Sequence, residues 1–179
     1  MLFRSPDLKL PPALREGIAA RYAAHKRPWA VLALGGSHPA KDWPDEHWVT
    51  FLDTLRRRTA GTVFLIGGPA NAARADALIA RTAGAPVVNA CDLSIGEAAA
   101  LLRLADLFVG PDSGPMNLAV AGGTPAFVLF GSTPVLDYSR FIHAIEPDDG
   151  LGRSSNGMSR ISPAAVMLRV EPYLDVVKG

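Results

Sequence analysis

Short apolar segments recur along the sequence from Trp29 onward, and each is followed by a glycine-containing turn and then by a segment of helical periodicity. The apolar segments are continuous and do not alternate with polar residues, which is typical of strands covered on both faces of a sheet. Strands that alternate with helices predict right-handed crossovers and a parallel, doubly wound α/β sheet of the Rossmann-like class. The predicted strands are residues 29–34, 62–66, 86–89, 107–109, 126–130 and 141–145.

Amphipathic helices are predicted between these strands. After the first strand, apolar residues have the i, i+3, i+4, i+7 spacing of a helix that rests one face on a sheet. Ser94 and Glu97 have the spacing of a capping box at the start of another helix. The residues expected to face the sheet are Trp48, Phe51, Leu52 and Leu55; Ala75, Leu78 and Ile79; Ile95, Ala98, Ala99 and Leu102; the segment 116–121; and Val166, Val170 and Leu174.

The sequence divides into two parts in this interpretation. Residues 1–27 are predicted to be a linker followed by a short packing helix, in which Leu14, Ile18 and Tyr22 are spaced by four. Residues 28–179 are predicted to form the Rossmann-like domain, with a flexible loop at residues 147–157. A chain of 179 residues has the usual length of one domain with its own core.

The charge and the cysteine content limit which classes of partner and which cell compartment are expected. The sequence has 18 Lys and Arg against 17 Asp and Glu, a net charge of +1, so no nucleic-acid partner is expected. The single cysteine, Cys91, fits a reducing compartment, and we expect a cytoplasmic protein. No apolar segment reaches the ~20 residues that cross a bilayer, and the amino terminus has no signal-peptide pattern.

The turn at residues 35–44 is the first candidate for chemistry, because ligands of such sheets bind beyond the carboxyl ends of the strands. Gly35 and Gly36 let the backbone approach a ligand closely. Ser37 offers a hydroxyl and Lys41 a mobile ammonium, a combination suited to phosphate oxygens. The alternative is an ordinary strand-to-helix turn with a surface lysine.

The turn at residues 110–117 is the second candidate. It leads into a helix whose amino terminus presents unpaired N–H groups, so Ser113 and Gly114 are placed to receive an anion. Asp112 either caps this helix or orients Lys41 or ligand hydroxyls, and the sequence leaves both roles open.

Other common types of site do not match the sequence. The turn at Gly67 and Gly68 is not the glycine pattern of an NAD site, and no P-loop pattern occurs. The four histidines lack metal-ligand spacing, so neither a metal nor a cofactor is expected. Only His38 lies where a histidine can face a ligand, whereas Trp43 and Trp48 are expected to pack the following helix against the sheet.

These turns carry an ordered set of motifs. They are Lys41-x-Trp43-Pro44, Gly67-Gly68-Pro69, Asp112-Ser113-Gly114-Pro115-Met116, Gly123-x-Pro125, Leu129-Phe130-Gly131-Ser132-Thr133 and Met158-Ser159-Arg160-Ile161-Ser162-Pro163. With this order the chain resembles, from about Pro28 to its end, the carboxyl-terminal half of the family 9 glycosyltransferases, the ADP-heptose:lipopolysaccharide heptosyltransferases. The first and third motifs together are fairly specific, and either alone is weak.

The resemblance implies an inverting GT-B enzyme with two Rossmann-like domains. Its carboxyl-terminal domain binds the nucleotide-diphosphate-sugar donor, here ADP-heptose, and its amino-terminal domain binds a glycolipid acceptor and supplies the general base. Carried over by motif, Ser37, Lys41, Ser113 and Gly114 contact the diphosphate, and Leu93 packs on the base. Lys41 acts only electrostatically, and no metal is needed because Lys41 and the helix dipole stabilise the departing diphosphate.

The sequence also departs from the family pattern. The amino-terminal acceptor domain is absent, so the chain alone is expected to be inactive. Asn117 stands where the family has histidine, and Asn71 or Ala72 stands where an acidic residue holds the ribose. The expected substrate-binding residues are Gly36, Ser37, Lys41, Leu93, Asp112, Ser113, Gly114 and Asn117.

Other functions stay open from sequence alone. One alternative is a non-catalytic remnant that acts as a nucleotide-binding or protein-interaction module, with self-association through the exposed cleft. Another is a small α/β hydrolase or epimerase on the same fold. A role in lipopolysaccharide or related glycan synthesis also leaves open a peripheral contact with the inner face of the cell membrane.

Overall fold

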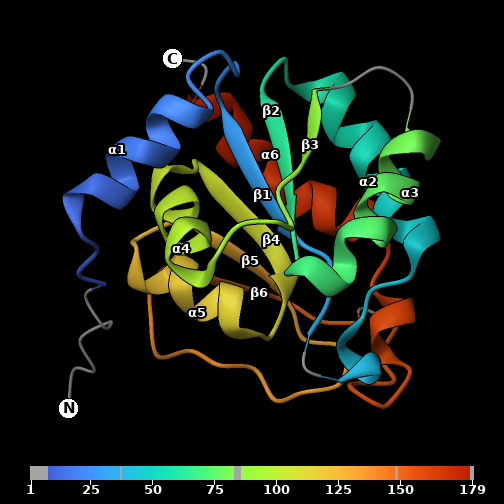
Figure 1. The fold of residues 1–179 in the computed structure, drawn as a ribbon. Coiled ribbons are helices and arrows are strands. Elements are labelled where there is room, and N and C mark those ends of the chain that lie inside the picture. Colours follow the sequence, from blue (N-terminus) through green and yellow to red (C-terminus); the bar gives the residue numbers. More distant parts are fainter. Residues whose placement is uncertain (1–7, 37, 83–85, 148, 178–179) are drawn as a thin grey trace.

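The computed structural model describes residues 8–36, 38–82, 86–147 and 149–177, and it contains one six-stranded parallel sheet (Figure 1). The strands lie in the order β3-β2-β1-β4-β5-β6, which confirms the doubly wound fold class. Their bounds are Trp29–Ala33 for β1, Thr62–Ile66 for β2, Val87–Asn89 for β3, Leu107–Pro111 for β4, Ala126–Leu129 for β5 and Ile142–Ile145 for β6. All six predicted strands are present, although β4 continues to Pro111 instead of ending at Val109.

The reversal of strand order lies between β1 and β4. Leu32 of β1 pairs with Leu65 of β2 on one side and with Val109 of β4 on the other. The chain therefore leaves the carboxyl ends of these two neighbouring strands toward opposite faces of the sheet, which opens a crevice between the two turns. The two candidate turns of the sequence follow β1 and β4, so the topology brings them together.

Three helices cover each face of the sheet (Figure 1). The helices α1 (Pro12–Arg21), α4 (Ile95–Leu104) and α5 (Gly114–Ala121) lie on one face. The helices α2 (Asp45–Arg58), α3 (Ala72–Arg81) and α6 (Pro163–Val177) lie on the other. Short 3-10 helices, η1 (Pro39–Lys41), η2 (Pro69–Asn71) and η3 (Gly157–Arg160), occur in the connections. No helix in these described ranges is long and apolar enough to cross a membrane.

Consecutive residues of the central strands enter different core layers. Leu32 packs in the layer with Trp48 of α2, whereas its neighbour Val31 packs in the layer with Leu101 of α4. All four side chains are fully buried. Burial on both faces explains why these strands are continuously apolar in sequence.

The start of α4 confirms one prediction and corrects another. The Ser94 and Glu97 capping box is present, because the Glu97 N–H donates to Ser94 Oγ at 3.3 Å and the Ser94 N–H to Glu97 Oε2 at 2.9 Å. Ile95 was expected to face the sheet, but its side chain is 79% exposed. Ile95 is the first residue of α4, and the buried face of this helix begins further along, at Ala99.

The amino-terminal helix packs on the domain. Ile18 and Tyr22 are buried in the core layer of α4 and α5, as their spacing predicts. The division of the chain at residue 27 stays a prediction, as does the flexibility of the loop at 147–157. In this loop the described residues 149–156 form no helix or strand, and Arg160 donates to the Asp149 carboxylate at 2.6 Å.

Candidate functional site

The loop after β1 is arranged around Lys41 and Asp42. The N–H of Gly36 donates to Asp42 Oδ1 at 3.2 Å, which closes the loop on itself. A Cβ at Gly36 would lie 2.9 Å from Lys41 Cβ, closer than such atoms approach. Glycine at this position therefore lets the Lys41 side chain cross the loop toward β4. Ser37, the predicted hydroxyl of this loop, lies outside the described residues.

Lys41 joins the first candidate turn to the second. Its Nζ donates to the Asp112 carbonyl oxygen at 2.9 Å and lies 3.2 Å from Asp112 Oδ2. The two side chains are 22% and 18% exposed, so water screens this ion pair only in part. In the structure Asp112 contacts Lys41, and Ser113, not Asp112, is the N-cap residue of α5. A role of Asp112 toward ligand hydroxyls stays a prediction. Asp112 engages two of the three ammonium protons, and the third has no partner among the residues that the structure describes.

The amino terminus of α5 is open. Ser113 is the N-cap residue, but its hydroxyl donates to the Pro111 carbonyl at 3.1 Å, and no side chain in the described residues caps the helix. Gly114, the first helical residue, is exposed, and a Cβ there would meet no atom within 4 Å. The free N–H groups and positive dipole end of this helix are a site that anions favour.

A pocket of about 360 Å³ lies at this crevice, and we call it the switch-point pocket. Its walls come from the ends of β1, β2 and β4 and from the first turns of α4 and α5. The lining residues are Gly35, Gly36, Ile66, Gly67, Gly68, Leu93, Ile95, Ala98, Ser113, Gly114, Pro115 and Leu118. Among these described residues none is charged, so the pocket joins an apolar wall to a helix amino terminus and fits a ligand with one flat apolar part and one anionic part.

The structure brings the predicted residues together in two groups. Gly36, Leu93, Ser113 and Gly114 line the switch-point pocket. Lys41 and Asp112 form the ion pair beside it, where Lys41 crosses Gly36. Their role in binding a substrate stays a prediction.

Asn117 is held by the fold on the exposed side of α5. Its Nδ2 donates to the Ser113 carbonyl at 3.3 Å, and its Oδ1 accepts from the Tyr138 hydroxyl. Burial raises the pKa of Tyr138, so the hydroxyl keeps its proton and remains a donor at neutral pH. Asn117 does not line the switch-point pocket, so its amide is tied to the start of α5 instead of facing the cavity.

The remaining polar and aromatic candidates have structural contacts. Nδ1 of His38 accepts from the Ala40 N–H at 3.2 Å, so this histidine caps η1. Trp43, and Trp48 of α2, are fully buried in the core layer between α2 and the sheet, as predicted. Trp43 Nε1 donates to the Ile161 carbonyl at 2.9 Å. Within the described residues, no group of His, Cys, Asp and Glu could hold a metal ion.

Arg74 of α3 is a residue that sequence reasoning missed. Its guanidinium donates to the carbonyl oxygens of Leu34 at 2.7 Å and Trp43 at 3.0 Å, the two ends of the Lys41 loop. It also pairs with Asp42 and Asp45. Arg74 thereby fixes both ends of the loop from a different helix. No local pattern in the sequence signals this role, because the contacts depend on how α3 packs against α2 and β3.

The family was tested by comparison with known proteins. The model of glycosyltransferase family 9 (heptosyltransferase) matches residues 5–147. The chain belongs to glycosyltransferase family 9. No curated protein matched this family 9 chain.

Solved structures show the same fold. A family 9 glycosyltransferase from Veillonella parvula has a TM-score of 0.81 at 21% identity, covering 95% of this chain and 54% of its own. Escherichia coli ADP-heptose lps heptosyltransferase II has a TM-score of 0.79 at 21% identity, covering 97% of this chain and 55% of its own. E. coli heptosyltransferase WaaC with ADP-2-deoxy-2-fluoro heptose has a TM-score of 0.68 at 21% identity, covering 94% of this chain and 50% of its own.

This family 9 chain therefore spans about half the length of the structures that it matches. The likeness confirms the fold class predicted from sequence, a Rossmann-like domain of the GT-B architecture. The family model, which matches residues 5–147, confirms the resemblance to the family.

Proposed function

We propose that the switch-point pocket binds the donor of a glycosyl transfer, a nucleoside-diphosphate sugar, with ADP-heptose as the expected donor. The observation that carries the proposal is the contact of Lys41 with Asp112, which brings a cation to the open amino terminus of α5 at the rim of an apolar pocket. Among the similar structures, E. coli WaaC was solved with ADP and with an ADP-heptose analogue, which supports the same class of ligand here.

Each part of the proposed site has a defined task. The third N–H of Lys41 and the free N–H groups at Ser113 and Gly114 bind the diphosphate oxygens. The apolar wall, which includes Leu93, packs on the flat base. The Ser37 hydroxyl adds a further donor to the diphosphate in this proposal.

The proposed reaction follows from where the charge develops. The acceptor hydroxyl oxygen forms a bond to the anomeric carbon while the bond from that carbon to the diphosphate oxygen breaks. The electron pair of the broken bond leaves with the nucleoside diphosphate, whose added negative charge Lys41 and the α5 amino terminus stabilise. The hydroxyl proton passes to a general base, which we place in a second, acceptor-binding domain.

That second domain completes the proposed enzyme. It binds the glycolipid acceptor in lipopolysaccharide or related glycan synthesis, so the 179-residue chain alone is expected to bind donor without transferring sugar. The proposed location is the cytoplasm. Burial raises the pKa of Cys91 to about 11, so this thiol stays protonated and unreactive there.

Calorimetric titration with ADP, UDP and GDP tests the proposal directly. We expect binding of at least one nucleoside diphosphate, with ADP the tightest, and weaker binding of the matching nucleoside. Absence of heat and of any thermal shift with all three at millimolar concentration would overturn the proposal. Preference for UDP or GDP over ADP would keep the donor pocket and reject ADP-heptose as the donor.

A further inference from the structure

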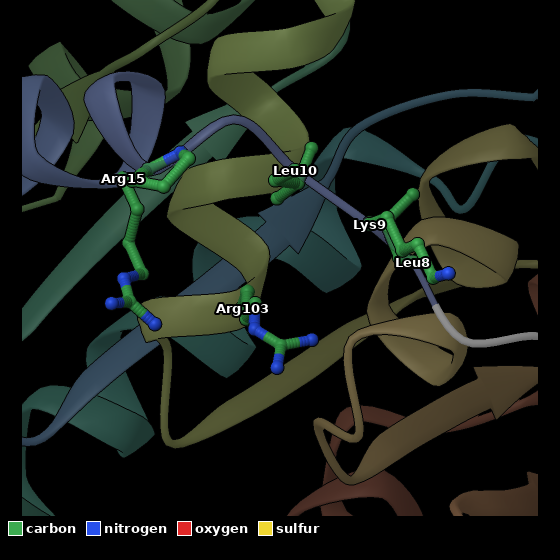
Figure 2. Close-up of a pocket in the computed structure, with 6 residues that line it drawn as sticks. Leu8, Lys9, Leu10, Arg15 and Arg103 are labelled. Carbon is green, nitrogen blue, oxygen red and sulfur yellow. The ribbon is translucent and has the colours of Figure 1, made fainter.

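A second pocket, of about 260 Å³, lies on the face of α1, α4 and α5 (Figure 2), and we call it the cationic pocket. It is lined by Leu8, Lys9, Leu10, Pro12, Arg15 and Arg103. The Leu8 N–H donates to the Ala121 carbonyl at 3.2 Å, which fixes the segment before α1 against the end of α5. The pocket walls therefore come from this segment, from α1 and from the last turn of α4.

The cationic pocket is separate from the switch-point pocket. The switch-point pocket lies at the first turns of α4 and α5, whereas Arg103 and Ala121 lie in their last turns. A helix of the length of α4, 10 residues, extends about 15 Å. A ligand in one pocket therefore does not contact the other, and the inference does not depend on the proposed function.

The cations of this pocket lack acidic partners. The side chains of Lys9, Arg15 and Arg103 form no hydrogen bond and no ion pair with any residue that the structure describes. Across all the residues that the structure describes, the cations that do pair with a carboxylate are Arg21, Arg27, Lys41, Arg58, Arg74, Arg81, Arg153 and Arg160. In a protein with a net charge of only +1, three unpaired cations at one pocket are a local concentration of positive charge.

Packing alone does not account for these residues. A cation in the last turn of a helix is stabilised by the helix dipole, which explains Arg103. Arg15 lies inside α1 and Lys9 precedes it, so the dipole of α4 does not explain either. In Figure 2 the side chains of Arg15 and Arg103 extend to the same side of the view. Like charges that line one pocket repel one another, and a bound anion lowers that repulsion.

We propose that Lys9, Arg15 and Arg103 form a binding site for a phosphate group. Arginine presents a planar fork of donors that matches phosphate oxygens in pairs, and lysine adds a mobile point charge. Leu8, Leu10 and Pro12 line the same pocket, so an apolar part of the phosphate ligand has a surface to contact. The phosphate is either free or carried by a lipid headgroup, and the experiment separates these sources.

Inorganic phosphate is the first probe. Calorimetry and amide NMR shifts are measured on the 179-residue chain and on an Arg15→Gln, Arg103→Gln double variant. We expect phosphate to shift the amide signals of residues 8–10 and 103, and the double variant to bind about tenfold more weakly or worse. Arg57→Gln is the matched control, because Arg57 is an exposed arginine whose one described partner is Thr54. Both substituted arginines are exposed, so thermal unfolding is expected to stay unchanged.

Vesicles are the second probe. Co-sedimentation is compared for phosphatidylcholine vesicles with and without phosphatidic acid. Vesicle binding that needs phosphatidic acid and is lost in the double variant, without binding of free phosphate, assigns the site to a lipid phosphate. Binding of free phosphate that the double variant loses assigns it to a soluble ligand. The proposal is overturned if the chain binds neither probe, or if the double variant binds as the unchanged chain or the Arg57→Gln control does.

A Lys41→Ala variant distinguishes this site from the proposed donor site. We expect it to keep the phosphate-induced shifts at residues 8–10 and 103, because Lys41 lies beside the other pocket. Loss of ADP binding with these shifts retained would separate the two sites. Loss of both on the single change at Lys41 would show that the phosphate had bound at the donor site, and it would reject the cationic pocket.

Discussion

The switch-point pocket and the cationic pocket lie at opposite ends of the same two helices, and they hold positive charge in different ways. Beside the switch-point pocket, Lys41 is bound to Asp112 and is mostly withdrawn from water. At the cationic pocket, Lys9, Arg15 and Arg103 are exposed, with no acidic partner among the described residues. One pocket thus has a single oriented cation, whereas the other has several that are free to move.

This difference predicts different kinds of binding. An oriented, partly buried cation loses little freedom when a ligand arrives, and its interaction is strong because little water screens it. Exposed cations on long side chains must be ordered by the ligand, and dissolved salt screens their attraction for the ligand. The switch-point pocket is therefore suited to select a ligand by its shape. The cationic pocket is suited to bind a phosphate group with low selectivity for the molecule that carries it.

The largest effect is expected from Lys41→Ala. Loss of a charge-assisted hydrogen bond costs about 1.5–3 kcal/mol, so ADP is expected to bind about 10- to 150-fold more weakly. Binding of adenosine is expected to change little, because the ammonium lies beside Asp112 and not on the apolar wall. Calorimetric titration with ADP and with adenosine measures both affinities.

A double variant, Lys41→Ala with Asp112→Asn, shows how much of the lost ADP affinity is due to the unpaired Asp112 carboxylate. Removing Lys41 alone leaves the Asp112 carboxylate unpaired near the diphosphate, which by itself repels the ligand. We expect the double variant to regain only part of the lost affinity. Full recovery would mean that the ammonium serves to neutralise Asp112 and that the diphosphate does not contact Lys41.

A smaller effect is expected from Gly36→Ala. The new methyl group would lie 2.9 Å from Lys41 Cβ and 3.1 Å from its Cδ, so the lysine side chain must shift away from Asp112. We expect ADP to bind about tenfold more weakly, with less change for adenosine, since the variant disturbs the orientation of one cation. Gly17→Ala in α1 is the control, because a Cβ there has no neighbour within 4 Å. Equal loss in both variants would contradict the role of Gly36.

The sequence predicts the fold because burial on both faces leaves a direct signal in each strand. It also locates the two candidate turns, since the carboxyl ends of parallel strands meet at one edge of a sheet. It leaves the role of Asp112 open, because this role depends on where Lys41, 71 residues away, places its ammonium. The exposure of Ile95 is missed for a related reason: periodicity defines a face of a helix but not whether a strand lies beneath it.

The role of Arg74 and the position of the cationic pocket are even harder to predict from sequence, because both depend entirely on how the helices pack. Arg74 contacts the carbonyl oxygens of Leu34 and Trp43, and a carbonyl oxygen is present at every residue, so no residue type marks the contact. Arg15 and Arg103 come from different helices and become neighbours only when α1 packs on α4. Each of these residues, taken singly in the sequence, is an ordinary surface arginine.

Salt should weaken binding at the two pockets unequally. Raising the ionic strength shortens the range of exposed charges to a few ångströms, so phosphate is expected to bind the cationic pocket several-fold more weakly. ADP at the switch-point pocket is expected to lose less affinity, since Lys41 is 22% exposed and the base rests on an apolar wall. Titrations of both ligands at low and high sodium chloride give the comparison. Parallel loss for the two ligands would show that the charges of both pockets are equally exposed to solvent.

The smallest effect is expected from Ile95→Ser at the mouth of the switch-point pocket. Ile95 is 79% exposed, so its loss leaves the free energy of unfolding nearly unchanged. A base that packs on the pocket wall covers part of the Ile95 side chain. This apolar contact contributes about 1 kcal/mol or less to the binding free energy, so ADP and adenosine should both bind about two- to fivefold more weakly. Leu168→Ser is the matched control, because Leu168 is 72% exposed on α6 and does not line the pocket. An equal loss of adenosine and ADP separates this apolar contact from the effect of Lys41, which acts on ADP alone. Unchanged binding of both ligands would place the base away from the first turn of α4.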